Sequence, residues 1–271
     1  MSILEYQFAV DAIMSMMFLS VVAGIIGTYI VVRRMVFVAG GITHASFGGI
    51  GIAYYMGVSP VCGAMLFSVL TALGIELLND KGKVREDSAI AMVWSLGMAV
   101  GVLFMFMTPG YAPNLMGYMF GDVLAVSRAD VWSVGIMSVV TLLGAIIFYR
   151  PIMYISFSPL FAQLTGWRVK VISALMSVVV AISLVLAIKT VGIILVLSIF
   201  TIPQSIANMF VRSMGRMMLL SAVIAMLSGM AGLAVAFVMD LPVGAVVTTM
   251  LTVVFFVVRM SVNITNKIAK R

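Results

Sequence analysis

His44 is the only histidine in this 271-residue chain, and it lies within an apolar segment that is rich in glycine. On an α-helix, Gly40 and Gly48 would stand one turn before and one turn after it on the same face. Imidazole is a common ligand of first-row metal ions, and an ionisable group inside a membrane segment marks a substrate path by default. The alternative is a structural histidine that donates to a backbone carbonyl across a tight helix contact. We favour the substrate path.

The glycines around His44 form two neighbouring stripes at helical spacing. Gly40 and Gly48 flank the histidine, and Gly41 and Gly49 run beside them. Small residues at this spacing allow helices in a membrane to approach closely, and they also leave room beside an imidazole ring. We therefore predict helix packing at all four glycines.

Four carboxylates and one amide are further candidates for polar chemistry. Gln204 follows a proline in an apolar segment, so its side chain could face a cavity and is a weaker candidate metal ligand. Asp240 precedes a Leu-Pro pair, and a turn or capping role is favoured over metal entry. For Asp122 too, a turn or capping role is favoured over metal entry. Glu76 and Asp80 come near the end of an apolar segment, where we expect them to be solvated.

Several catalytic signatures are absent from the sequence. There is no GxxxxGK[ST] motif for ATP hydrolysis, no HExxH and no Cys/His cluster. One histidine inside an apolar segment cannot form a Ser/His/Asp constellation. The single Cys62 cannot form an intrachain disulfide. These absences argue against an enzyme.

The composition indicates what must position these residues. Hydrophobic residues make up 63% of the chain and charged residues 9%, with a mean hydropathy of +1.24. A soluble domain could not cover that much apolar surface, so we predict an all-α, multi-pass membrane protein surrounded by lipid. The net charge of +7 comes from basic residues in short connections, which are topology signals and do not indicate a nucleic-acid partner.

Continuous apolar runs predict about nine membrane-spanning helices, within a range of eight to ten, in a single transmembrane domain of residues 1–271. Their approximate ranges are 10–32, 41–56, 60–78, 88–107, 131–149, 171–188, 191–210, 217–239 and 243–258. Residues 108–130 contain repeated proline and glycine and are predicted to form a loop with a short or re-entrant helix. Residues 150–170 form a connection with a short surface helix, which has a proline near its start and a glycine just past its end.

The positive-inside rule sets the predicted orientation. The connections after spans one, three, five and seven, and the tail after span nine, hold most of the basic residues, whereas the other side holds only Arg128 and Lys189. Cytoplasmic connections carry the excess of lysine and arginine. We therefore expect the C-terminus in the cytoplasm and the N-terminus outside.

Taken together, these residues resemble the membrane permease subunit of bacterial zinc, manganese and iron ABC importers. The resemblance covers nearly the whole chain, in the same order and at similar spacing. It rests on Arg33-Arg34-Met35 with Thr43-His44-Ala45 and Gly48-Gly49, Asp87-Ser88-Ala89-Ile90 with Gly97 and Gly101, Phe120-Gly121-Asp122, Phe161-Ala162 through Gly166, Val191-Gly192 through Ile202-Pro203, and Asp240-Leu241-Pro242-Val243-Gly244.

The resemblance implies a fold, a set of partners and a substrate. The fold is a bundle of eight to ten helices, as in the permeases of metal- and vitamin-type ABC importers, in the bacterial cell membrane. The partners are a second permease copy, ATP-binding subunits that use the ATP, and an external or periplasmic metal-binding protein. The substrate is a divalent metal ion that His44 meets in transit, with no permanently bound cofactor. The segment 150–170 would contact the ATP-binding subunit through Ser158, Pro159, Phe161, Ala162, Leu164 and Gly166.

This chain departs from the family pattern at one position. The family usually has an aspartate four residues before the histidine, and this chain has Gly40 there. Without that carboxylate, two copies of His44 across a dimer axis could still form a weak two-nitrogen site. Three alternatives stay open: a permease for a chelated metal or siderophore, a proton-coupled cation carrier that works alone, and a structural scaffold.

Overall fold

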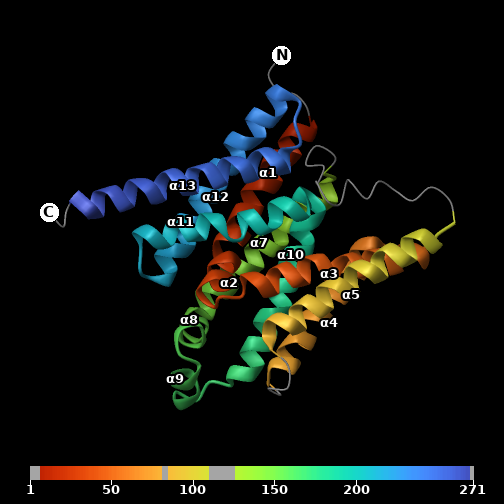
Figure 1. The fold of residues 1–271 in the computed structure, drawn as a ribbon, viewed down its shortest axis with the longest axis horizontal. Coiled ribbons are helices and arrows are strands. Elements are labelled where there is room, and N and C mark those ends of the chain that lie inside the picture. Colours follow the sequence, from red (N-terminus) through yellow and green to blue (C-terminus); the bar gives the residue numbers. More distant parts are fainter. Residues whose placement is uncertain (1–6, 81–84, 110–125, 269–271) are drawn as a thin grey trace. The chain divides into compact units, whose positions relative to one another are not determined.

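The computed structural model describes residues 7–80, 85–109 and 126–268, and the regular elements in these residues are all helices (Figure 1). The helices are α1 Gln7–Val22, the π-helical η2 Ala23–Gly27, α2 Thr28–Val32, α3 Val36–Tyr55, α4 Pro60–Asp80, α5 Glu86–Met107, α7 Arg128–Ile147, α8 Tyr149–Phe157, α9 Pro159–Leu164, α10 Val169–Ile199, α11 Ile202–Phe210, α12 Met214–Met239 and α13 Val243–Ile268. The all-α membrane fold predicted from the sequence is therefore confirmed.

Eight helical segments of the described residues are long and apolar enough to cross a membrane. One of them, Val169–Phe210, has 42 residues, about twice the length that one crossing needs. The sequence predicted two spans here, at 171–188 and 191–210. The structure instead continues the helix past Lys189 and interrupts it at Gly192, whose φ of 79° and ψ of 164° are not helical. The count of eight in the described residues lies within the predicted range of eight to ten, and it is one below nine because these two spans form one interrupted segment.

A second interruption lies close to the first. α10 ends at Ile199 and α11 begins at Ile202, with Pro203 in its first turn. Proline is accepted in the first turn of a helix because its missing N–H would have no partner there. The kink predicted for Pro203 is thus a break between two helices just before the proline.

The chain divides into two compact units. One holds the described residues of Met1–Val32, Met119–Ile147 and Thr190–Arg271, and the other holds those of Arg33–Tyr118 and Phe148–Lys189. In the second unit, α3 packs along both α4 and α5, which lie beside it in orange and yellow in Figure 1. Its buried core includes Phe47, Ile50, Ala64, Met105 and Val185.

The predicted re-entrant region is described only in part. Residues 110–125, which include Asp122, lie outside the described residues. The helix that follows, α7, begins with a capping box: the backbone N–H of Asp130 donates to Ser127 Oγ at 3.3 Å, and the backbone N–H of Ser127 donates to Asp130 Oδ2 at 3.2 Å. This pair fixes where the fifth predicted span starts.

Candidate functional site

The helix that carries His44 packs against its neighbours through glycine. A Cβ on Gly48 would lie 2.8 Å from the carbonyl oxygen of Gly97 on α5, and a Cβ on Gly97 would lie 2.5 Å from Ala45 Cα. On the other side of α3, a Cβ on Gly49 would collide with the carbonyl oxygen of Gly63 on α4. Backbone therefore meets backbone on two sides of α3, which only glycine permits. The helix that carries His44 thus packs closely against α4 and α5.

Gly41 makes a looser contact of the same kind. A Cβ there would lie 2.6 Å from the Cγ2 atom of Ile90, which is the end of a side chain and can move. Gly40 is buried. Of the four glycines predicted for packing, Gly48 and Gly49 thus have the closest backbone neighbours.

The imidazole of His44 stacks on the indole of Trp94. The ring centroids lie 4.2 Å apart and the ring planes differ by 10°. Phe37, one turn before Gly41, also contacts this indole, with a centroid distance of 6.2 Å and ring planes tilted by 50°. Both ring nitrogens of an imidazole lie in the ring plane, so a partner on the ring face leaves them open to a ligand. His44 is half-buried, which leaves part of the ring accessible.

The surroundings of His44 do not form a closed metal site. Among residues 7–80, 85–109 and 126–268, no group of three or more His, Cys, Asp or Glu side chains could hold a metal ion. Gly40 occupies the position one helical turn before the histidine, where a carboxylate would share its face. A single imidazole suits brief contact with a passing ion better than stable coordination.

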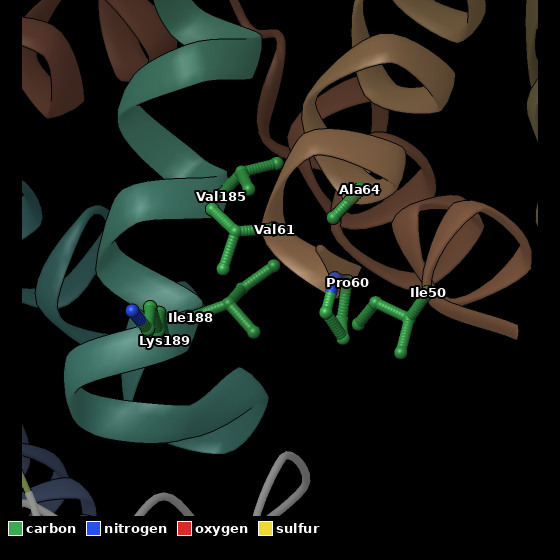
Figure 2. A pocket seen from close by; sticks show the side chains of 7 residues that line it. All are labelled: Ile50, Pro60, Val61, Ala64, Val185, Ile188 and Lys189. Atoms are coloured by element: carbon green, nitrogen blue, oxygen red, sulfur yellow. The ribbon is translucent and has the colours of Figure 1, made fainter. Parts of the chain in front are cut away.

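A pocket between helices of this unit is apolar. Its lining comes from α3, α4 and α10, and Figure 2 shows the side chains of Ile50, Pro60, Val61, Ala64, Val185, Ile188 and Lys189. The volume open to the centre of a water-sized sphere is about 10 Å³. That is about the room for one water molecule. Hydrocarbon walls and so little space do not suit a hydrated cation.

Gln204 is completely buried and ties two irregular stretches of backbone together. Its Nε2 donates to the carbonyl oxygen of Ala23 at 2.7 Å and to that of Ile199 at 3.3 Å. Ala23 begins η2 and Ile199 ends α10, so both carbonyls lie where regular helical bonding is disturbed. A Cβ on Gly27 of η2 would collide with the side-chain amide of Gln204, so the glycine makes room for that amide. The contacts of this side chain are those of a structural brace.

Two of the other polar candidates have clear local settings. Asp240 is exposed and adopts the left-handed conformation that ends α12, with φ of 54° and ψ of 45°. This is the turn role that the sequence favoured. Glu76, expected to be solvated, is half-buried, and its Oε2 accepts a hydrogen bond from Ser177 Oγ of α10 at 2.9 Å. The sequence could not show this because the two residues lie 101 positions apart.

The short surface helix predicted in the 150–170 connection is α9. Ser158 caps its start by accepting the N–H of Phe161, and Pro159 takes its first position. At its end, Gly166 has a φ of 86°, and Trp167 donates to the carbonyl of Ala162 in a Schellman closure. Ala162 is buried, whereas the side chains of Leu160, Phe161 and Leu164 are 68%, 49% and 79% exposed. α9 thus presents an exposed apolar surface, on which Phe161 also packs edge-on against Tyr154 with 5.2 Å between the ring centroids.

Sequence reasoning missed two contacts of this unit, Trp94 against His44 and Arg33 against α8. Arg33 Nη1 donates to the carbonyl oxygen of Ile155 at 3.0 Å. The sequence did hold one signal for the Trp94 contact. Trp94 is an aromatic residue three positions before Gly97, on the helix that carries Gly97 and Gly101. No local signal connects Arg33 to residue 155.

Comparisons with known proteins match nearly the whole chain. Residues 5–262 match the ABC 3 transport family. The manganese transport system membrane protein MntC of Halalkalibacterium halodurans is 33% identical over 94% of this chain and 88% of its own length. A probable metal transport system membrane protein of Chlamydia pneumoniae is 35% identical over 86% of this chain and 81% of its own. The solved structure of PsaBC from Streptococcus pneumoniae in complex with Fab matches with a TM-score of 0.85 and 24% identity, over 94% of this chain and 92% of that one, which shows a shared fold.

Proposed function

The chain belongs to the ABC 3 transport family, and on that premise we propose that it is the permease subunit of an ATP-driven importer of a divalent metal ion. Manganese is the first candidate because MntC of Halalkalibacterium halodurans and MntC of Listeria monocytogenes are named for manganese transport. Zinc and iron are the other candidates, because a lone imidazole suits these ions at least as well.

The observation that carries this proposal is the setting of His44. It is a half-buried imidazole inside a membrane-spanning helix, with its ring plane fixed by Trp94 and its helix fixed by glycine contacts. A fixed ring lowers the entropic cost of each brief contact with an ion. The absence of a carboxylate at Gly40 keeps that contact weak, and weak binding allows release during transport.

The proposed partners follow from the surface of α9 and from the family. An ATP-binding subunit would cover the exposed side chains of Leu160, Phe161 and Leu164, which lie on a connection predicted to be cytoplasmic. A second permease copy would bring another His44 to the path, and an external metal-binding protein would deliver the ion. The C-terminus is proposed to be cytoplasmic and the N-terminus external.

Uptake by membrane vesicles tests the function. Zinc, manganese and iron uptake should depend on ATP and on the co-purified ATP-binding subunit, and His44→Ala should lower uptake of the transported metal about tenfold or more. A stably folded His44→Ala variant with unchanged uptake of all three metals would refute the role of His44. Transport by the chain alone in liposomes, driven by a proton gradient, would instead support the stand-alone carrier.

Gly40 also favours a second candidate, import of a chelated metal. A chelate brings its own ligands, so its path needs no carboxylate beside the imidazole. Uptake distinguishes the two. In the first case the complex should take up free manganese, and excess siderophore-bound iron should not compete. In the second case it should take up siderophore-bound iron and not free manganese.

A further inference from the structure

Arg33 joins two parts of the unit that the sequence keeps far apart. It lies in the short junction that follows α2, three residues before α3 begins at Val36. Its Nη1 donates to the carbonyl oxygen of Ile155, 122 positions later on α8, at 3.0 Å. Ile155 is 1% exposed. A guanidinium thus reaches the buried backbone of another helix.

Pro159 explains why that carbonyl needs a donor from outside its own helix. The carbonyl of Tyr154 accepts the N–H of Ser158 at 2.8 Å, which is the regular bond to the fourth following residue. The corresponding donor for Ile155 would be residue 159, and proline has no N–H. A buried carbonyl without a partner is costly. Arg33 therefore replaces the hydrogen bond that Pro159 cannot make.

The two ends of this bond lead to the two functional regions of the unit. Ile155 is three residues before Ser158, which caps α9. Arg33 precedes α3, whose backbone is fixed against α4 and α5 by the glycine contacts that also hold His44 in place. Arg34, between Arg33 and α3, has a φ of 58°, so the junction is a sharp corner that any residue except glycine adopts at some cost. A movement of α9 can therefore reach α3 through this bond.

We propose that Arg33 is a positioning residue that couples the surface helix α9 to the His44 helix, so that ATP-driven movement at α9 changes access to the metal path. The proposal rests on the proposed function. Its distinctive consequence is a change in the ratio of metal moved to ATP hydrolysed. A residue that only stabilised the fold would lower both rates together.

The test uses the complete complex with its ATP-binding subunit in proteoliposomes, with uptake and ATP hydrolysis measured in the same vesicles. Arg33→Gln and Arg33→Lys remove the guanidinium, and Lys keeps the charge. Arg34→Asn is the matched control, because Arg34 is exposed and asparagine accepts a positive φ. We expect both Arg33 variants to lower uptake per ATP by roughly tenfold with hydrolysis largely kept, and Arg34→Asn to keep the wild-type ratio.

Hydrogen exchange gives a second readout that does not depend on transport. In Arg33→Gln and Arg33→Lys, the amides of α9 and of the first turn of α3 should exchange faster together, whereas Arg34→Asn should leave them protected. Wild-type ratios and unchanged exchange in the Arg33 variants would overturn the proposal, as would an equal fall in uptake and hydrolysis. A wild-type complex that moves no metal would refute the proposed function, and exchange would still decide whether Arg33 links the two helices.

Discussion

His44 and Trp94 lie face to face, with 4.2 Å between their ring centroids and 10° between their planes. The indole belongs to α5 and the imidazole to α3, and glycine contacts between these two helices set the distance. Ligand histidines are usually oriented by a hydrogen bond to the second ring nitrogen. In His44 the plane of the imidazole is instead set by its stacking on an aromatic face.

Because Trp94 stacks on His44, its fluorescence should report the proposed binding of metal at His44. Trp132 and Trp167 are 72% and 40% exposed, so replacing both by phenylalanine should leave Trp94 as the single tryptophan in a folded protein. Manganese is paramagnetic and should quench Trp94 emission on binding at His44. The quenching should disappear in the same background with His44→Ala. Persistent quenching in that variant would show that manganese binds elsewhere.

Removing the indole should weaken the site without removing its ligand. Trp94→Leu keeps an apolar side chain but frees the imidazole to rotate, and stacking of this kind contributes about 0.5–1.5 kcal/mol. The KM for manganese uptake should therefore rise about twofold to tenfold. Trp132→Leu is the control, since Trp132 is exposed on α7, and its KM should stay at the wild-type value.

The missing carboxylate can be restored. Gly40→Asp would place an oxygen ligand one turn before His44, and oxygen ligands favour manganese over zinc. Manganese affinity should rise by roughly tenfold, or about 1.4 kcal/mol, while release and turnover slow. Gly40→Asn has nearly the same size without the charge and should not tighten manganese binding. Equal affinities in the two variants, measured by equilibrium binding, would contradict a site at this position.

The sequence predicted the local features of this fold well because those features are encoded locally. Glycines eight residues apart on one face, Gly40 with Gly48 and Gly41 with Gly49, indicated close packing of α3. Ser158, Pro159 and Gly166 indicated the limits of α9. The pairing of His44 with Trp94 depends on the register between two helices, and the bond from Arg33 to Ile155 joins residues 122 positions apart. Neither contact can be predicted from the local sequence around the residues that make it.

The predicted boundary between the spans 171–188 and 191–210 differs from the structure for a related reason. Lys189 looked like a polar end between two apolar runs, but a lysine near a helix end can extend to the membrane surface while the helix continues. The actual interruption is at Gly192, and a glycine in an apolar segment is weak evidence of a break on its own. The π-helical η2 had no signal at all in composition.

Two glycines of α4 should respond to alanine in opposite ways. A Cβ on Gly63 would collide with the carbonyl of Gly49 and lie 2.6 Å from Ala53 Cβ, whereas a Cβ on Gly74 would meet nothing within 4 Å. Gly63→Ala should therefore destabilise the protein by about 1–3 kcal/mol through overpacking. Gly74→Ala should be neutral or stabilising by up to about 1 kcal/mol. Thermal unfolding in detergent measures both, and equal melting temperatures would contradict the packing described here.

The apolar surface of α9 should be required for assembly. Leu164 is 79% exposed, so Leu164→Asp should fold normally but place a charge where the ATP-binding subunit is proposed to dock. Co-purification of that subunit should fall at least about tenfold. Gln163→Ala changes an exposed neighbour on the same helix and should leave assembly intact. Undiminished co-purification with Leu164→Asp would refute docking at this surface.

Gln204 should contribute to stability through its amide donor rather than through metal binding. Gln204→Leu keeps most of the volume but leaves the carbonyls of Ala23 and Ile199 without their side-chain donor, at a cost of about 1–3 kcal/mol for each carbonyl that finds no other partner. Gln204→Glu keeps an oxygen ligand and removes the donor. If Gln204 is a brace, both variants should unfold at lower temperature. If it is instead a metal ligand, Gln204→Glu should bind manganese at least as tightly as the wild type and Gln204→Leu should not, so equilibrium binding measured beside the melting curves separates the two roles.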